Sequence, residues 1–236
     1  VCRENRIRSL IPQELMTCRE TIRLALGRIR NECVDTCWTD AGQPPVPEWI
    51  HCGDASYSGG DILESGYRIV LQAAPEEVWK PIVRIGGKTG WYSANALWFV
   101  RGAMDRLVGG IGLRRGRRDP VRLLAGDAVD FFRVLEVEEP RHLHLLAEMR
   151  FPGEASLEFR LHPMEDGRTE LQQLSRYVPR GLSGLLYWYA LYPFHEWVFR
   201  GMLNGIAKAV GKPIVQGPDR FAPRRHHVCH FDPRAS

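Results

Sequence analysis

A run of strands in the middle of the chain is predicted by the alternation of apolar and polar residues. In His142–Arg150 and Ala155–His162 every second residue is apolar, which is the period of a strand with one face in a core and one toward water. Ala128–Val137 and Thr169–Val178 are also strand-like, and the short turns between the four runs favour antiparallel neighbours. With an earlier strand at Ile62–Leu71, these runs predict one curved antiparallel sheet.

Apolar residues at helical spacing predict two short helices before this meander and one long helix after it. The first begins at Pro75, and the second covers about Ala94–Val108. The long helix, Leu182–Val210, is rich in aromatic residues, and charged residues interrupt it before it could cross a bilayer. This order predicts an α+β fold class in which the last helix covers the apolar face of the sheet, and the two can enclose a cavity.

The chain divides into three regions. Residues 1–60 hold an amphipathic helix at Ile11–Ile29, a short strand at Cys33–Thr39 and a linker rich in proline and glycine. Residues 61–213 are the expected α+β domain. Residues 214–236 form a basic tail, which we expect to be disordered because it has no apolar periodicity.

Composition and charge narrow the function classes. The 236 residues are 44% hydrophobic and 25% charged, which is typical of a globular domain and excludes a fibrous or wholly disordered chain. The net charge of +4 is too small to indicate a polyanion partner, so we expect no nucleic acid. Most of the cysteines lie near the start and no signal segment precedes them, which indicates reduced thiols and a cytoplasmic protein. Cys33 and Cys37 lack a second close ligand pair, so we expect no metal.

Five motifs along the chain carry a resemblance to a known family. They are Arg84–Tyr92, Asp105–Gly110, Gly112–Arg118, Gly126–Val134 and Tyr192–His195. On these motifs the chain, from about Ile62 to Pro213, resembles the DUF2867 family of the START/Bet v 1-like (SRPBCC) helix-grip superfamily. The resemblance implies a curved antiparallel sheet wrapped on a long C-terminal helix, a hydrophobic ligand pocket and, in other branches, hydrolase or cyclase-like activity.

The resemblance also implies a partner domain. Members of the family often follow a Rossmann-type, epimerase-like NAD(P)-binding domain, and Leu10–Gly42 resembles the closing helix and strand of such a domain. The chain begins at Val1, and three explanations of that start are open: a fragment, a processed product and a GTG start codon. No strand–Gly-x-Gly-x-x-Gly–helix unit is present in the sequence, so we expect this chain to bind no cofactor. Two hypotheses follow: binding of an apolar or amphipathic small molecule, and the C-terminal portion of an NAD(P)-dependent epimerase or oxidoreductase whose catalytic domain lies upstream.

The expected ligand-binding residues line the space between the sheet and the last helix. Arg133 and His195 are the polar anchors of a set that is otherwise mostly aromatic. The set is Trp91, Tyr92, Trp98, Phe131, Arg133, Met149, Phe159, Trp188, Tyr192 and His195. Core packing is the alternative for the aromatic side chains, and the glycines at 86–90 form either a pocket mouth or an ordinary turn.

A basic loop is the candidate site for an anion or a headgroup. Its four arginines are Arg114, Arg115, Arg117 and Arg118. Guanidinium groups can hold a carboxylate, a phosphate or a lipid headgroup by paired hydrogen bonds, and a solvated loop is the alternative. Asp127, Asp130 and Arg133 have two possible roles. They either orient a polar group of the ligand, or they pair within the protein, in which case the two aspartates bind the arginines of the basic loop.

His195 is the catalytic candidate. A histidine on a buried helix face can titrate near neutral pH and act as acid or base, with Asp130 or Glu148 as its partner in a hydrolase or cyclase. No Gly-x-Ser-x-Gly turn in the sequence supplies a nucleophile, and a hydrogen-bonded structural histidine is the alternative.

Overall fold

The computed structural model describes residues 16–30, 47, 49, 62–113 and 117–222. The expected strand at Cys33–Thr39, nearly all of the proline- and glycine-rich linker and the end of the basic tail lie outside these ranges. Most of the segment that resembles the end of an epimerase-like domain lies outside them too.

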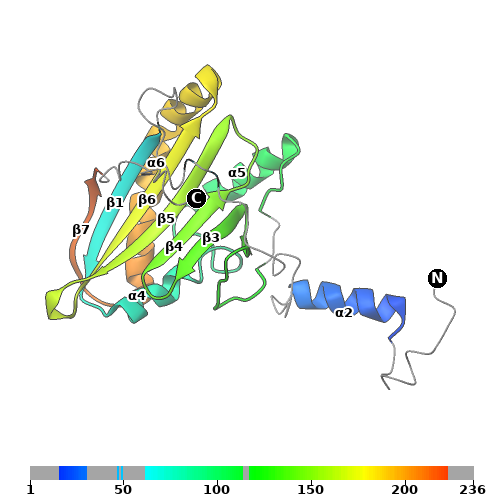
Figure 1. Ribbon diagram of the computed structural model, residues 1–236, viewed down its shortest axis with the longest axis horizontal. Helices are drawn as coiled ribbons and strands as arrows, with labels where there is room; N and C mark the ends of the chain where they lie inside the picture. The colour runs from blue at the N-terminus through cyan, green and yellow to red at the C-terminus, as the bar shows by residue number, and fades with distance from the viewer. Residues whose placement is uncertain (1–15, 31–46, 48, 50–61, 114–116, 223–236) are drawn as a thin grey trace, which may run out of the picture.

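The centre of the described chain is a seven-stranded antiparallel sheet in the order β2-β3-β4-β5-β6-β1-β7 (Figure 1). The strands are β1 (Leu63–Leu71), β2 (Ala128–Val129), β3 (Phe132–Glu138), β4 (His142–Ala147), β5 (Gly153–Pro163), β6 (Thr169–Pro179) and β7 (Ile214–Phe221). Strands β2 to β6 are the predicted meander, and β1 joins it by pairing with β6.

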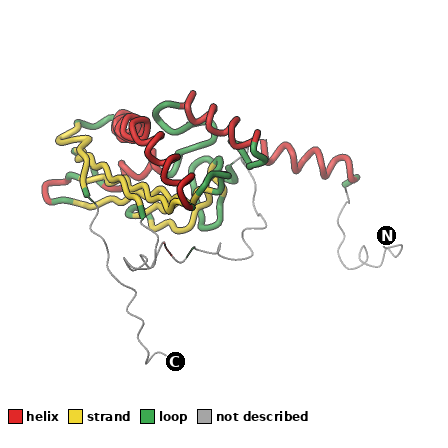
Figure 2. Tube along the Cα trace, turned by 90° about the horizontal axis from the view of Figure 1, so that it is seen from above, coloured by secondary structure: helices red, strands yellow, loops and turns green. Residues whose placement is uncertain are grey.

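Helices cover one face of this sheet (Figure 2). They are α4 (Pro75–Ile82), α5 (Asn95–Leu107) and α6 (Gly181–Val210), and a short 3-10 turn, η2 (Glu165–Gly167), joins β5 to β6. Helix α6 contacts β1, β6, β7 and α4, and the hydrophobic core fills the space between them. The predicted α+β helix-grip architecture, a curved sheet that grips a long C-terminal helix, is therefore confirmed.

The two halves of α6 have different surroundings. The C-terminal half carries most of the buried side chains of the helix: Val198, Phe199, Met202, Leu203, Ile206 and Ala207. Gly201 and Gly205 let it pass close to the 92–93 loop, because a Cβ at these glycines would collide with Ser93 and Tyr92. The N-terminal half buries only Gly184 and Trp188, so it is held by fewer contacts.

Strand β7 is a correction to the expected disordered tail, because Ile214–Phe221 pairs with β1 as an antiparallel edge strand. Gly211 adopts a left-handed conformation that ends α6 and turns the chain back to the sheet. The strand was missed because Ile214 and Val215 are exposed and Pro218 resembles a loop residue. An edge strand tolerates proline, since one side of its backbone has no ladder to complete.

Helix α2 (Cys18–Arg30) realises the predicted amphipathic helix, and its apolar Ile22 and Leu26 are exposed. Thr17 and Glu20 form a capping box at its start, in which the Glu20 carboxylate accepts the Thr17 N–H at 2.8 Å. Cys18 is a free, exposed thiol. Within the described ranges, no helix combines the length and apolar character needed to span a membrane.

Candidate functional site

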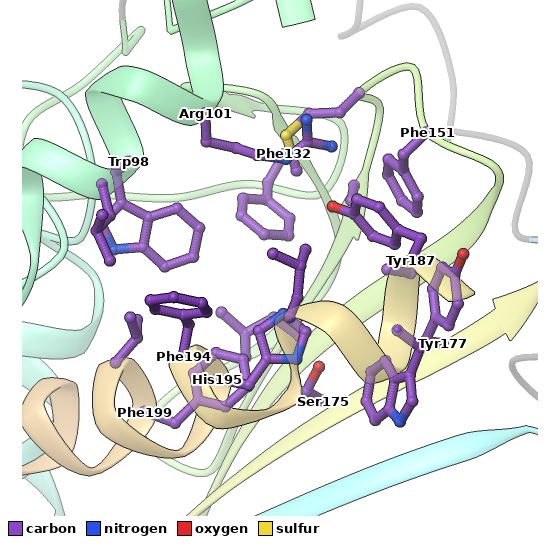
Figure 3. A pocket seen from close by; sticks show the side chains of 18 of the residues that line it. Trp98, Arg101, Phe132, Phe151, Ser175, Tyr177, Tyr187, Phe194, His195 and Phe199 are labelled. Atoms are coloured by element: carbon purple, nitrogen blue, oxygen red, sulfur yellow. The ribbon is translucent and has the colours of Figure 1, made fainter. Parts of the chain in front are cut away.

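A cavity of about 290 Å³ lies between the N-terminal half of α6, helix α5 and the middle strands of the sheet (Figure 3). Helix α5 contributes Leu97, Trp98, Val100, Arg101 and Met104. The sheet and its connections contribute Phe132, Ala147, Met149, Phe151, Ala155, Ser156, Leu157, Ser175 and Tyr177. Helix α6 contributes Tyr187, Trp188, Leu191, Phe194, His195, Val198 and Phe199.

The cavity exists because small side chains stand on the sheet where the helices cross it. Ala147, Ala155 and Ser175 leave room above β4, β5 and β6. Large side chains from the two helices surround this room without filling it, as Figure 3 shows for Trp98 on α5 and Phe194 on α6. The sheet therefore forms the floor, and the helices form most of the walls.

Aromatic rings build the walls and hold one another in place. Trp188 stacks on Tyr177 with ring centroids 5.4 Å apart, and Tyr187 stacks on Phe151 at 5.9 Å. Phe199 stacks on the His195 ring at 5.4 Å. Because interlocked rings have few alternative rotamers, these walls keep their shape without a ligand.

The rim of the cavity is apolar and open to solvent. Val100 and Met104 on α5 and Phe194 on α6 both line the cavity and are more than half exposed. Exposed apolar side chains that continue into a hollow are typical of the entrance to a ligand site.

Four residues that line the cavity have a polar atom that is buried without a hydrogen-bond partner among the described residues: Nδ1 of His195, Nε1 of Trp98, a terminal nitrogen of Arg101 and the hydroxyl of Ser156. Burial, helped by the charge of Arg101, lowers the pKa of His195 to about 4. At neutral pH His195 is therefore uncharged, and one of its ring nitrogens carries a proton.

The low pKa of His195 predicts acid sensitivity. Between pH 6.5 and 4 the unfolded chain binds a proton at this residue and the folded chain does not, so the free energy of unfolding decreases as the pH falls. The loss reaches up to about 3 kcal/mol for a shift of this size. Urea titrations at pH 7.5 and 4.5 measure it, and His195→Gln should reduce the difference between the two.

His162→Gln, on the exposed part of β5, is the matched control and should leave the pH dependence as in the wild type. Equal pH dependence in wild type and His195→Gln would show that His195 does not titrate in this way.

Four of the ten expected ligand-binding residues meet in the cavity: Trp98, Met149, Trp188 and His195. The other six do not line it. Phe131 and Phe159 are fully buried in the core. The hydroxyl of Tyr92 donates to the Pro81 carbonyl at 2.9 Å, and the guanidinium of Arg220 lies over the Tyr192 ring at 5.4 Å.

Trp91 and the glycine loop form a closed turn against Asp130. The backbones of Gly86 and Gly90 exchange two hydrogen bonds, and a Cβ on Gly86 would collide with Val129. The Asp130 carboxylate accepts the Trp91 Nε1–H at 2.9 Å and the Gly87 N–H at 3.2 Å. None of these residues lines the cavity, so the loop is a packed turn beside the core.

The two described arginines of the basic loop bind the protein itself. Arg117 is only 3% exposed and donates to the carbonyls of Val83 and Ile85 at the end of α4. Arg118 binds Asp127 through two hydrogen bonds of 2.9 and 3.1 Å. Arg114 and Arg115 lie outside the described residues.

Both carboxylates expected to assist His195 have other partners. Asp130 holds the glycine turn, and Glu148 pairs with Arg133 through hydrogen bonds of 3.1 and 3.2 Å. Arg133 also donates to the Gly126 carbonyl. Neither Asp130 nor Glu148 lines the cavity, so the walls place His195 among aromatic rings and Arg101.

A second polar group lies on β3 and β4, away from the cavity. Among the described residues, Glu136, His142 and His144 have atoms that could ligate a metal ion within 4.8 Å of one another. His142 Nε2 is already hydrogen-bonded to Glu158 Oε1 at 2.6 Å, which leaves Nδ1 as its available ligand atom. Burial lowers the pKa of His144 to about 4, so it is neutral at pH 7.

Arg101, Tyr187 and Phe151 line the cavity but were not among the residues predicted from the sequence. A signal for Arg101 was present, since a charged residue interrupts the apolar face of α5 between Trp98 and Met104, at spacings of three. Phe151 follows β4 in a turn, where no periodic pattern marks a buried side.

A curved antiparallel sheet, a long helix laid across it and an apolar cavity between them define a helix-grip protein. The family model described as "Protein of unknown function (DUF2867)" matches residues 59–202, and the chain belongs to this family. No curated protein matches the sequence.

Three solved structures illustrate what the chain is similar to. The Zhui aromatase/cyclase from Streptomyces sp. R1128 is 15% identical, with 64% of this chain and 94% of that chain covered and a TM-score of 0.39. Norcoclaurine synthase from Thalictrum flavum is 8% identical, with 66% and 98% covered and a TM-score of 0.40. An HSP90 activator from Plasmodium falciparum is 12% identical, with 66% and 98% covered and a TM-score of 0.35.

Proposed function

We propose that the protein binds an apolar or amphipathic small molecule in the cavity between α5, α6 and the sheet. The observation that carries the proposal is the cavity itself, about 290 Å³ of space with largely apolar and aromatic walls. This volume lies just below the usual range for small-molecule sites, roughly 300–1,000 Å³, and suits a small ligand.

The energetics favour an apolar occupant. Burial of apolar surface contributes about 25 cal/mol per Å² removed from water. Tyr177, Trp188 and Phe199 offer flat surfaces to a ligand, and their ring contacts fix them before it arrives. The apolar rim at Val100, Met104 and Phe194 gives such a molecule an apolar surface at the entrance.

Filling the cavity tests the proposal. Ala155→Phe places a ring on the floor and should weaken binding of the neutral fluorescent probe N-phenyl-1-naphthylamine at least tenfold, because the space is then occupied. A fluorescence titration measures the dissociation constant, and a thermal melt establishes that the variant folds. Ala209→Phe, at the exposed end of α6, is the matched control and should bind as the wild type does.

Equal affinity of the wild type and Ala155→Phe would place the probe elsewhere on the molecule, and absence of saturable binding to the wild type would refute the proposal. Native mass spectrometry of protein purified from its own host complements the titration, because a retained apolar molecule adds a discrete mass.

A further inference from the structure

We infer that the natural ligand carries an anionic group and that Arg101 binds this group at the wall of the cavity. The inference rests on the proposed binding function and specifies the class of ligand: an apolar body with a carboxylate or another oxyanion.

Arg101 is held in position by two aromatic rings. It extends from α5 toward the cavity (Figure 3), and its guanidinium carbon lies 5.7 Å from the centre of the Phe151 ring and 5.6 Å from that of Tyr187. Contacts of this kind attract a guanidinium to the face of a ring but do not neutralise its charge. One terminal nitrogen is buried with no hydrogen-bond partner in the described chain.

The acid that would normally pair with Arg101 is already bound to the backbone. Asp105 lies four residues later on α5, the spacing of a helical ion pair. Its Oδ1 accepts the Arg150 N–H at 2.7 Å, and its Oδ2 accepts the Gly112 N–H at 2.8 Å. Within residues 62–113 and 117–222, no carboxylate forms an ion pair with Arg101.

The wall around Arg101 provides positive charge and, among the described residues, no counter-charge. None of the described residues that line the cavity is acidic, and His195 is uncharged at neutral pH. Arg101 is partly buried, and a charge without a counter-charge is costly in apolar surroundings, so an anionic ligand would relieve part of that cost.

A carboxylate suits this arrangement because a guanidinium can donate two parallel hydrogen bonds to it. The aromatic rings on either side would then contact the apolar body of the same ligand. The cavity therefore selects by charge at one point and by shape elsewhere.

Two probes of equal shape test the charge. 2-Naphthoate and 2-naphthamide differ only in the ionised group, and each can be titrated at pH 7.5 by displacement of N-phenyl-1-naphthylamine. The wild type should bind the naphthoate at least tenfold more tightly than the amide. Arg101→Gln should reduce this ratio to about one and leave the affinity for the amide within twofold. Arg106→Gln, exposed on the same helix, should keep the wild-type ratio.

The possible outcomes distinguish the preference for an anionic ligand from binding in the cavity itself. If the wild type binds both probes equally, the anionic preference is wrong and cavity binding stands. If neither probe displaces the dye, the ligand class is wrong, and absence of dye binding as well would refute the cavity proposal. The ratio of the wild-type affinities for the naphthoate and the amide tests the anionic preference even if Arg101→Gln does not fold.

Discussion

Replacement of Asp105 by alanine should lower the free energy of unfolding by about 3–5 kcal/mol, because two buried backbone donors lose their acceptor. Asp105 is completely buried, and its carboxylate accepts the N–H groups of Gly112 and Arg150. These bonds tie α5 to the loop after it and to the segment that follows β4. Urea denaturation at pH 7.5 measures the loss.

Two further variants calibrate this result. Asp105→Asn keeps one acceptor oxygen and turns an amide N–H toward the other donor, so its loss should be intermediate. Glu165→Ala, in the exposed η2 turn, should change stability by less than about 0.5 kcal/mol. A loss below about 1 kcal/mol for Asp105→Ala would mean that water replaces the carboxylate at little cost.

Replacement of Arg117 by methionine should cost about 2–4 kcal/mol of stability. Its guanidinium is almost fully buried and donates to three carbonyls, those of Val83, Ile85 and Asp119. The first two belong to the turn that ends α4, so the side chain caps that helix from a distant part of the chain. The same urea titration measures the loss.

Arg117→Lys distinguishes charge from geometry. A lysine ammonium keeps the charge but cannot reproduce the planar fork, so we expect most of the loss to remain. Arg122→Met, at an exposed position nearby, is the control and should be nearly neutral. If Arg117→Lys were as stable as the wild type, the positive charge alone would explain the role of Arg117.

The sheet and the long helix were predictable because their apolar periods are local. The run at Ala155–His162 lies within β5 (Gly153–Pro163), and Leu182–Val210 matches α6 to within one residue. The break between β2 and β3 was not predictable, since Asp130 reverses the chain through a positive φ of 53° inside an apolar run. Its hydrogen bonds with the glycine turn, some forty residues earlier, help to hold Asp130 in that conformation.

The site was predictable in kind but not in detail. Trp91 and Trp98 look alike in the sequence, yet Trp91 is in the core and Trp98 lines the cavity. The difference depends on which side chains stand opposite, and small residues such as Ala147 and Ala155 are distant in the sequence. Likewise, Arg117 and Arg118 share a charged motif, but only the fold shows that one binds backbone carbonyls and the other binds Asp127.

The two halves of α6 have different tasks: one half packs in the core, and the other half lines the cavity. Stability depends on the C-terminal half, where six side chains fill the core and two glycines allow close packing. The lining that α6 gives to the cavity comes mainly from its N-terminal half, between Tyr187 and His195. We expect substitutions in that half to alter the cavity lining while the core stays intact. The shape of the cavity can therefore change by substitution without rebuilding the fold.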